Sequence, residues 1–301
     1  MNTEKTKTTT GILYAFTAFT TWGFLPLYWR LLVQVPPIQI LAHRVSWSLV
    51  FVSVLVIVKN RLPEVKIAFS RLTNQLIFLA SALFLGVNWA IYIWAINTNH
   101  VVESSMGYFI NPLVNVLLGM VFFKERLRFW QGISVILAFS GVFYMALQYG
   151  KLPWIALSLA FCFGTYGLLR KVSPAGSVIG LFAETALLTP AAVVYILIKH
   201  SQGEGFFGVS SLWITFLLSG AGVVTSLPII WFARAVRRIP LSTVGFIQYL
   251  APSLMLLVSV TVFREPFTKA HLISFGLIWA ALILYSLSNT GILKSRFFSG
   301  E

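Results

Sequence analysis

The chain has 301 residues, of which 58% are hydrophobic and only 10% are charged, and its formal net charge is +14. Soluble domains carry about 25% charged residues, so this composition excludes a water-soluble protein and indicates one that lies in a membrane. The single cysteine, Cys162, excludes an intramolecular disulfide.

Ten apolar segments follow one another along the chain, each close to the length of about 20 residues that a helix needs to cross a bilayer. Lipid offers the backbone no hydrogen-bond partner, so we expect every segment to be an α-helix. The sequence therefore predicts an all-α membrane protein whose transmembrane helices cover residues 11–31, 38–58, 74–97, 104–123, 129–148, 152–170, 177–198, 212–233, 241–263 and 270–289.

The basic residues predict how these segments are oriented. With the N-terminus in the cytoplasm, sixteen of the 22 Lys and Arg residues fall on the inside and five on the outside, and Arg44 lies within a span. This bias follows the positive-inside rule, so we expect both termini in the cytoplasm. It also explains the net charge by topology, so the expected partner is the lipid bilayer and not a nucleic acid.

The second half of the chain resembles the first after a shift of roughly 140 residues. The matching residues are Pro112 with Pro252, Phe123–Glu125 with Phe263–Glu265, Ser104–Gly107 with Ser242–Gly245, and more weakly Trp22-Gly23 with Phe163-Gly164 and Arg44 with Glu184. Each unit holds five spans, and an odd number inverts the second copy in the membrane. We therefore expect two inverted five-helix repeats, residues 1–149 and 150–301, as is typical of secondary transporters.

Several runs of sequence resemble a known family. They are Gly86–Trp89, Glu103–Leu113, His43–Val45, Glu184-Thr185 with Pro190, Gly222–Pro228, and Gly245–Tyr249 with Pro252. Together they resemble the RarD branch of the EamA-type transporters, in the drug/metabolite transporter superfamily, over essentially the whole chain. The resemblance implies a ten-helix protein of the bacterial inner membrane that exports metabolites or drugs. Lys124 and Arg264 depart from the pattern, which favours glycine before the loop glutamate.

Two charged residues, Arg44 and Glu184, lie deep within predicted spans. A charge at that depth costs about 2.5–3.5 kcal/mol, so it normally faces a cavity or a partner. One interpretation is a fixed Arg44–Glu184 ion pair that only stabilises the bundle. The other places both at a transport cavity, with Arg44 binding an anionic group and Glu184 a cationic group or a proton. Glu103 is a further coupling candidate, unless its charge only stabilises a helix N-terminus.

Polar and aromatic residues inside the spans complete the candidates for substrate binding, namely Asn88, Trp89, Tyr92, Tyr108, Asn111, Gln248 and Tyr249. Such amides hold helices together as readily as they bind a ligand. Pro112, Pro228 and Pro252 each remove a backbone hydrogen bond inside a span, which bends a helix, so we expect them at a gate or a cavity wall.

The sequence thus predicts a transporter that exports a small organic molecule by alternating access. Proton coupling through Glu184 is one hypothesis, and an uncoupled facilitator or channel is the alternative. The four histidines are scattered, and neither metal-ligand spacing nor a nucleophile elbow occurs, so we expect no enzyme, metal or cofactor. The substrate and the oligomeric state stay open.

Overall fold

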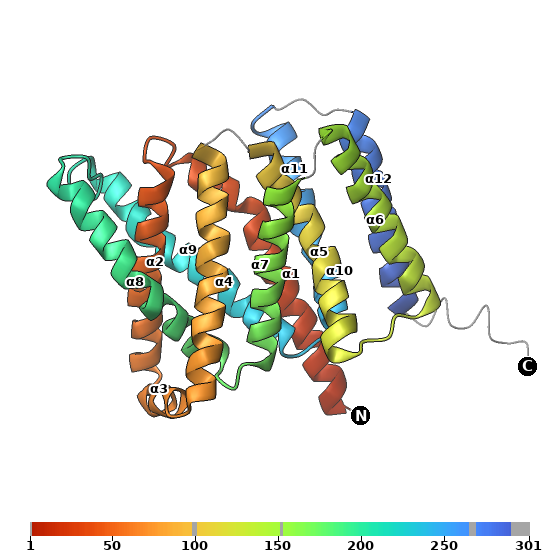
Figure 1. Ribbon diagram of the computed structural model, residues 1–301, viewed down its shortest axis with the longest axis horizontal. Coiled ribbons are helices and arrows are strands. Elements are labelled where there is room, and N and C mark those ends of the chain that lie inside the picture. Colours follow the sequence, from red (N-terminus) through yellow and green to blue (C-terminus); the bar gives the residue numbers. More distant parts are fainter. Residues whose placement is uncertain (1, 98–100, 151–152, 265–268, 290–301) are drawn as a thin grey trace, which may run out of the picture.

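The computed structural model describes residues 2–97, 101–150, 153–264 and 269–289 (Figure 1). All regular elements in these ranges are α-helices, so the predicted all-α fold is confirmed. In chain order they are α1 (Asn2–Arg30), α2 (Pro37–Val58), α3 (Leu62–Phe69), α4 (Leu72–Asn97), α5 (Val101–Phe123), α6 (Phe129–Tyr149), α7 (Trp154–Val172), α8 (Ser177–Ser201), α9 (Leu212–Val236), α10 (Leu241–Gln248), α11 (Leu250–Thr261) and α12 (Lys269–Asn289).

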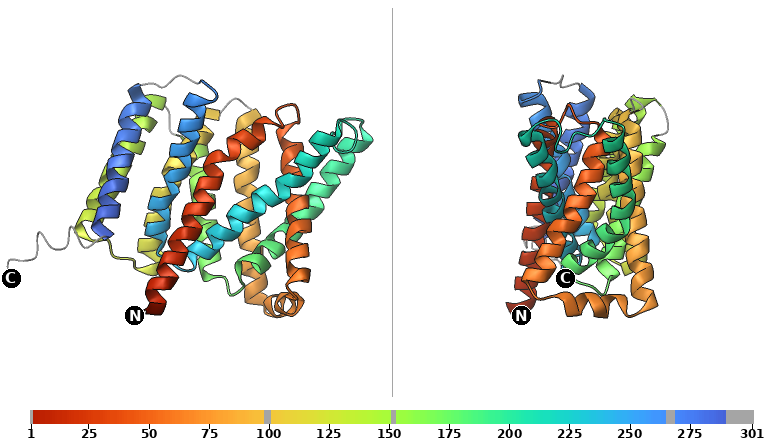
Figure 2. Two further views of the ribbon diagram at one scale, coloured as in Figure 1. Left: turned by 180° about the vertical axis from the view of Figure 1, so that it is seen from behind. Right: turned by 90° about the vertical axis from the view of Figure 1, so that its left-hand side faces the viewer.

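Nine segments of the described chain are long and apolar enough to cross a membrane. They are α2, α4, α5, α6, α7, α8, α9, α10 together with α11, and α12. Helix α1 is not among them, because threonines, tyrosines and Pro26 dilute its apolar stretch. It nevertheless runs the full height of the bundle beside the other helices (Figure 2).

The long helices form a bundle two layers thick (Figures 1 and 2). In one layer α7 packs against α4 and α5, and in the other α1 packs against α9 and α11. The layers meet where α5 contacts α10. The pair of α2 and α8 closes one end of the row, and the pair of α6 and α12 lies at the other. The centre of the bundle is therefore enclosed by helices from both halves of the chain.

The predicted span 241–263 consists of two helices, α10 and α11, that meet at Tyr249. Pro252 lacks a backbone N–H and cannot donate to the carbonyl four residues earlier, that of Gln248, where α10 ends. Pro112 and Pro228 also lie inside helices, yet α5 and α9 continue through them. A helix break thus accompanies only Pro252 among the three predicted kink prolines.

The connection between the predicted spans 38–58 and 74–97 contains the short helix α3, which lies across one end of the bundle (Figure 2). Val65 and Phe69 pack against the hydrophobic core, while Arg61 and Glu64 form an exposed ion pair of 2.6 Å. Apolar residues on one face and charges on the other are typical of a helix at a membrane surface. Its eight residues are too few to span the bilayer, so a search for spans overlooks it.

The residues that depart from the family pattern adopt the same unusual backbone conformation. Lys124, after α5, has a φ of 53°, and Arg264, after α11, has a φ of 55°. This left-handed region suits glycine, whereas a residue with a Cβ atom pays roughly 1–2 kcal/mol for it. Both turns thus place a residue with a Cβ atom in the conformation that suits glycine, the residue that the resemblance leads us to expect there.

Replacing Lys124 by glycine should therefore stabilise the protein by about 1 kcal/mol, because it removes the steric cost of the left-handed conformation. The measurement is the midpoint of thermal unfolding in detergent. Lys124→Ala is the control, since it loses the same charge and keeps the Cβ atom. Equal midpoints for the two variants would contradict the backbone explanation.

Candidate functional site

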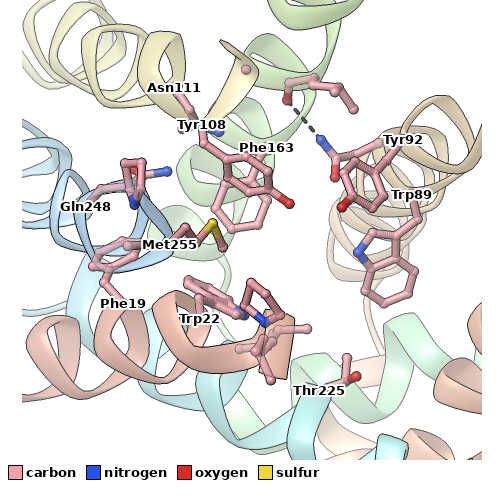
Figure 3. A pocket seen from close by; sticks show the side chains of 18 of the residues that line it. Phe19, Trp22, Trp89, Tyr92, Tyr108, Asn111, Phe163, Thr225, Gln248 and Met255 are labelled. Carbon is pink, nitrogen blue, oxygen red and sulfur yellow. Dashed lines mark hydrogen bonds between the residues drawn. The ribbon is translucent and has the colours of Figure 1, made fainter. Parts of the chain in front are cut away.

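A cavity of about 200 Å³ lies at the centre of the bundle (Figure 3). Its walls come from α1, α2, α4, α5, α7, α9, α10 and α11, and therefore from both halves of the chain. Of the candidates from the sequence, the structure brings eight together around it: Arg44, Asn88, Trp89, Tyr92, Tyr108, Asn111, Gln248 and Pro252. Trp89 and Tyr92 stand on one side, opposite Phe19, Gln248 and Met255 (Figure 3).

Arg44 is the charged residue of the described cavity wall. Its Nε donates a hydrogen bond of 3.0 Å to Oγ1 of Thr225 on α9. The guanidinium carbon lies 4.7 Å from the ring centroid of Trp29 and 5.3 Å from that of Trp89, which are cation–π distances. None of the ion pairs in the described part of the chain includes Arg44. Its charge is thus supported by aromatic faces and one hydroxyl.

Helices α2 and α9 approach closely enough for this contact because Gly222 has no side chain. A Cβ atom there would overlap the backbone of Trp47, and the hydroxyl of Ser48 donates to the carbonyl of Gly222 at 3.2 Å. Arg44 lies one turn before Ser48, and Thr225 lies one turn after Gly222. The tight crossing therefore positions the guanidinium at the cavity.

Aromatic rings form most of the remaining wall. Trp22 of α1 and Phe163 of α7 meet edge to face at 5.7 Å between ring centroids, and Tyr92 and Tyr108 do so at 6.3 Å. Trp89 was the tryptophan predicted for the site, so Trp22 and Trp29 are cavity residues that sequence reasoning missed. The pairing of Trp22 with Phe163 in the internal repeat was the available signal.

The amide side chains at the cavity are largely occupied by other protein groups. Asn115, buried behind the wall, donates to Gln248 at 2.6 Å and to Asn111 at 3.3 Å, and so links α5 to α10. Asn88 donates to the carbonyl of Leu159 at 2.9 Å, which links α4 to α7. These bonds support a role in holding the helices around the cavity, the structural alternative for the amides.

Glu184 does not line the cavity, and the suggested Arg44–Glu184 ion pair is wrong. Glu184 is fully buried, and its carboxylate lies 3.5 Å from Arg170 of α7. It also accepts hydrogen bonds from Ser81 at 2.7 Å and Tyr166 at 3.1 Å. The depth of Glu184 along its helix was predictable from the sequence, but its partner depends on how each helix is rotated about its axis.

Arg170, the last residue of the predicted span 152–170, was counted among the sixteen basic residues on the inside, yet only 1% of it is exposed. Helix α7 continues to Val172, so Arg170 still lies inside the bundle and points at α8. There Gly180 makes room for it, because a Cβ atom at this position would overlap the guanidinium. Glycine one turn before Glu184 was the sequence signal for a bulky partner.

The other predicted site residues lie elsewhere. Tyr249 is buried in a separate hydrophobic cluster with Phe246 and Tyr285 and does not line the cavity. Pro112 and Pro228 are not cavity residues either. The side chain of Glu103 lies outside the described part of the structure.

The two ends of the cavity differ. Toward the end of α1 it adjoins an open hollow of about 480 Å³, with which it shares Pro26, Trp29 and Tyr92 and whose rim includes Arg30 and Phe263. The opposite end of the bundle, where α5 ends and α10 begins, is tied together by Glu125. A hollow thus continues the cavity toward the end of α1, whereas Glu125 holds the helices together at the other end.

Glu125 connects three elements at that tied end. Its carboxylate accepts hydrogen bonds from the backbone N–H groups of Leu241 and Ser242 at 2.8 and 3.0 Å, and from the Ser242 hydroxyl at 2.7 Å. Nζ of Lys171, at the end of α7, lies 3.7 Å away. A carboxylate at a helix N-terminus is favoured by the helix dipole, so this contact caps α10. We call it the Glu125 clamp.

Replacing Gly180 by alanine should lower stability by about 3 kcal/mol or more, because the methyl group displaces Arg170 from Glu184 and leaves buried charges unpaired. Gly276→Ala is the matched control, since a Cβ atom at this helical glycine meets no neighbour within 4 Å. The thermal midpoint in detergent measures both. A Gly180→Ala protein as stable as the control would contradict the assigned role of the ion pair.

Comparison with known proteins identifies the family. The profile of the EamA-like transporter family matches residues 9–147. The "Uncharacterized transporter YojE" of Bacillus subtilis is 42% identical over 293 residues, which cover 95% of this chain and 96% of that protein. "Protein RarD" of Escherichia coli is 41% identical over 281 residues, covering 93% and 94%. The "Chloramphenicol-sensitive protein RarD" of Pseudomonas aeruginosa is 30% identical over 290 residues, covering 95% and 96%.

A solved crystal structure shares the fold, with a TM-score of 0.72 at 19% identity, and the match covers 93% of this chain and 98% of that one. The family and the names of these relatives indicate a transporter and not an enzyme. The chain therefore belongs to the RarD branch of the EamA-like transporter family and is a multi-pass membrane protein that carries small molecules across the lipid bilayer.

Proposed function

We propose that the protein is an alternating-access exporter of the inner membrane, with ten crossings, both termini in the cytoplasm, and a substrate site in the central cavity. The observation that carries the proposal is the position of this cavity between the two halves of the chain. In secondary transporters built from inverted repeats, the substrate site lies at the interface of the repeats. Helix α1 supplies the tenth crossing, since it runs the height of the bundle (Figure 2).

Pairs of equivalent contacts support the division into repeats 1–149 and 150–301. Gly23 of α1 faces Leu254 of α11, where a Cβ atom would lie 2.6 Å from Leu254. Gly164 of α7 faces Val114 of α5 in the same way, at 2.7 Å. The shift that matches the two halves relates Leu254 to Val114. The left-handed turns at Lys124 and Arg264 form another equivalent pair.

The two ends of the cavity support one direction of opening. In the predicted topology the hollow beside Arg30 faces outward, and the Glu125 clamp lies at the cytoplasmic end. This conformation has the features expected of a state that releases an exported substrate. Loading from the cytoplasm then requires α10 to separate from Glu125.

The surroundings of Glu184 argue against a direct exchange of proton for substrate at this carboxylate. Ser81, Tyr166 and Arg170 hold it away from the cavity. No acidic residue occurs among the described residues of the cavity wall. That observation favours a second candidate function, an uncoupled facilitator that uses the same cavity.

Transport by purified protein in proteoliposomes tests the proposal. The panel of metabolites and drugs includes chloramphenicol, because one relative is named for sensitivity to it. A proton-coupled exporter concentrates a substrate against its gradient when a pH gradient is imposed, and a protonophore abolishes the effect. A facilitator only equilibrates the substrate, and absence of saturable transport of any compound would overturn the proposed site.

Glu184→Gln should preserve any gradient-driven accumulation while lowering the thermal midpoint, because the carboxylate balances Arg170 and does not reach the cavity. Glu64→Gln on the exposed helix α3 is the matched control and should change neither property. Loss of accumulation with substrate exchange retained, in a stable Glu184→Gln protein, would restore the proton-coupling hypothesis.

Glu125→Gln should open the cytoplasmic end, because a neutral amide replaces the charged acceptor that caps α10. A cysteine at Asn111, in a Cys162→Ser background, reports on access. A hydrophilic thiol reagent added to the cytoplasmic side should react about fivefold faster or more, since hydrogen bonds to charged groups contribute about 1.5–3 kcal/mol.

The same Glu64→Gln exchange serves as control for the loss of a carboxylate at that end of the bundle. An unchanged reaction rate in the Glu125→Gln protein would show that the Glu125 clamp does not close the pathway.

A further inference from the structure

We infer that the cavity selects a small organic monoanion, whose acidic group binds Arg44 and whose planar apolar body lies between the aromatic side chains. This inference rests on the proposed function and names the substrate class for the same site. The inference is based on the positive charge of Arg44, which no carboxylate of the described residues balances, and on cavity walls that suit a flat ring.

The two arginines buried within the bundle differ in how their charges are satisfied. Arg170 is paired with Glu184 and also donates to the carbonyls of Gly176 and Ser177 at 3.3 Å. Arg44 has one hydrogen bond, from Nε to Thr225, and no carboxylate partner among the described residues. A cation within a span is stable only with a partner or water, so an anionic ligand supplies what Arg44 lacks.

The geometry of Arg44 favours a carboxylate. Because Nε is bound to Thr225, the two terminal nitrogens remain for a ligand, and they form the planar fork that binds two oxygens at once. The rings of Trp29 and Trp89 hold the guanidinium by cation–π contacts. The fork is therefore oriented before the substrate arrives, which reduces the entropy lost on binding.

The rest of the wall suits an aromatic body. Trp22, Tyr92, Tyr108 and Phe163 border the same space (Figure 3). Aromatic pairs prefer offset-stacked or edge-to-face contacts, which a flat ring makes with walls of this kind. The volume of about 200 Å³ restricts the ligand to a small molecule.

The wall also disfavours an organic cation. Among the described wall residues the charge is that of Arg44 alone, so an amine without an acidic group meets a like charge and no carboxylate. Glu184, the carboxylate of the predicted seventh span, is paired with Arg170 and does not line the cavity. The site therefore discriminates by charge, because Arg44 faces the cavity while Arg170 and Glu184 neutralise each other away from it.

Binding of three probes of one shape tests this inference on the purified full-length protein. The probes are 3-phenylpropionate, 3-phenylpropanol and 3-phenylpropylamine, which differ in charge and share the ring and chain. Calorimetric titration should give the propionate an affinity about tenfold or more above that of the other two, a difference of about 1.4 kcal/mol. Arg44→Gln should abolish this preference, so that the propionate binds no more tightly than the alcohol.

Further variants separate charge from folding. Arg71→Gln removes an exposed arginine far from the cavity wall and should bind all three probes as the native protein does. Arg44→Lys keeps the charge without the fork, and Thr225→Val releases Nε. Both should weaken propionate binding selectively, so they test the inference even if Arg44→Gln fails to fold.

Two results would overturn the inference. One is an amine or alcohol that binds as tightly as the propionate, and the other is undiminished propionate preference in Arg44→Gln, Arg44→Lys and Thr225→Val. Transport in proteoliposomes of neutral or cationic compounds alone would also refute the anionic class while leaving the proposed function intact. Absence of saturable transport would instead refute the function.

Discussion

A charge inside a bilayer must be balanced by protein, water or ligand, because lipid supplies neither hydrogen bonds nor counter-ions. This protein meets the constraint at two places, and the arrangement of its helices depends on both. Arg170 and Glu184 neutralise each other between α7 and α8, with Ser81 of α4 completing the network. Arg44 is held by two tryptophans and a threonine at a cavity, where its charge remains accessible to a substrate.

Glycines let the helices meet this constraint. A side chain at position 180 would leave the Arg170 guanidinium no space beside α8, and the lack of one at Gly222 lets α2 and α9 cross tightly enough for Arg44 to reach Thr225. The same two glycines therefore decide which arginine is paired and which faces the cavity. Close helix packing and substrate chemistry are linked here through backbone spacing.

Sequence patterns predicted the helices well, because the length and polarity of each segment are properties of that segment alone. They missed α3, which is too short to count as a span. They predicted a bend at Pro252, where the structure interrupts the span at Tyr249, and also at Pro112 and Pro228, where α5 and α9 continue. Much of the cavity wall followed from polar residues in apolar spans, as for Arg44 and Asn111.

Contacts between helices were harder to predict. Arg170, at the end of the predicted span 152–170, was counted with the basic residues on the cytoplasmic side, whereas α7 continues to Val172 and buries it. Trp22 and Trp29 were not predicted for the cavity, because tryptophan generally favours the membrane surface and its place in a span does not indicate a cavity between helices. The rotation of a helix about its axis sets its neighbours, and an apolar segment surrounded by other helices or lipid carries little information on that rotation.

The short sequence separation of Arg170 and Glu184 has a consequence for biosynthesis. The two residues belong to consecutive helices joined by a brief connection, so they can meet as soon as α8 has left the ribosome. The Arg170–Glu184 pair then enters the lipid without net charge, which lowers the energy of inserting either residue. Arg44 enters with α2 long before Thr225 of α9 has been synthesised. Until the last third of the chain is made, the Arg44 charge contacts only the faces of Trp29 and then Trp89.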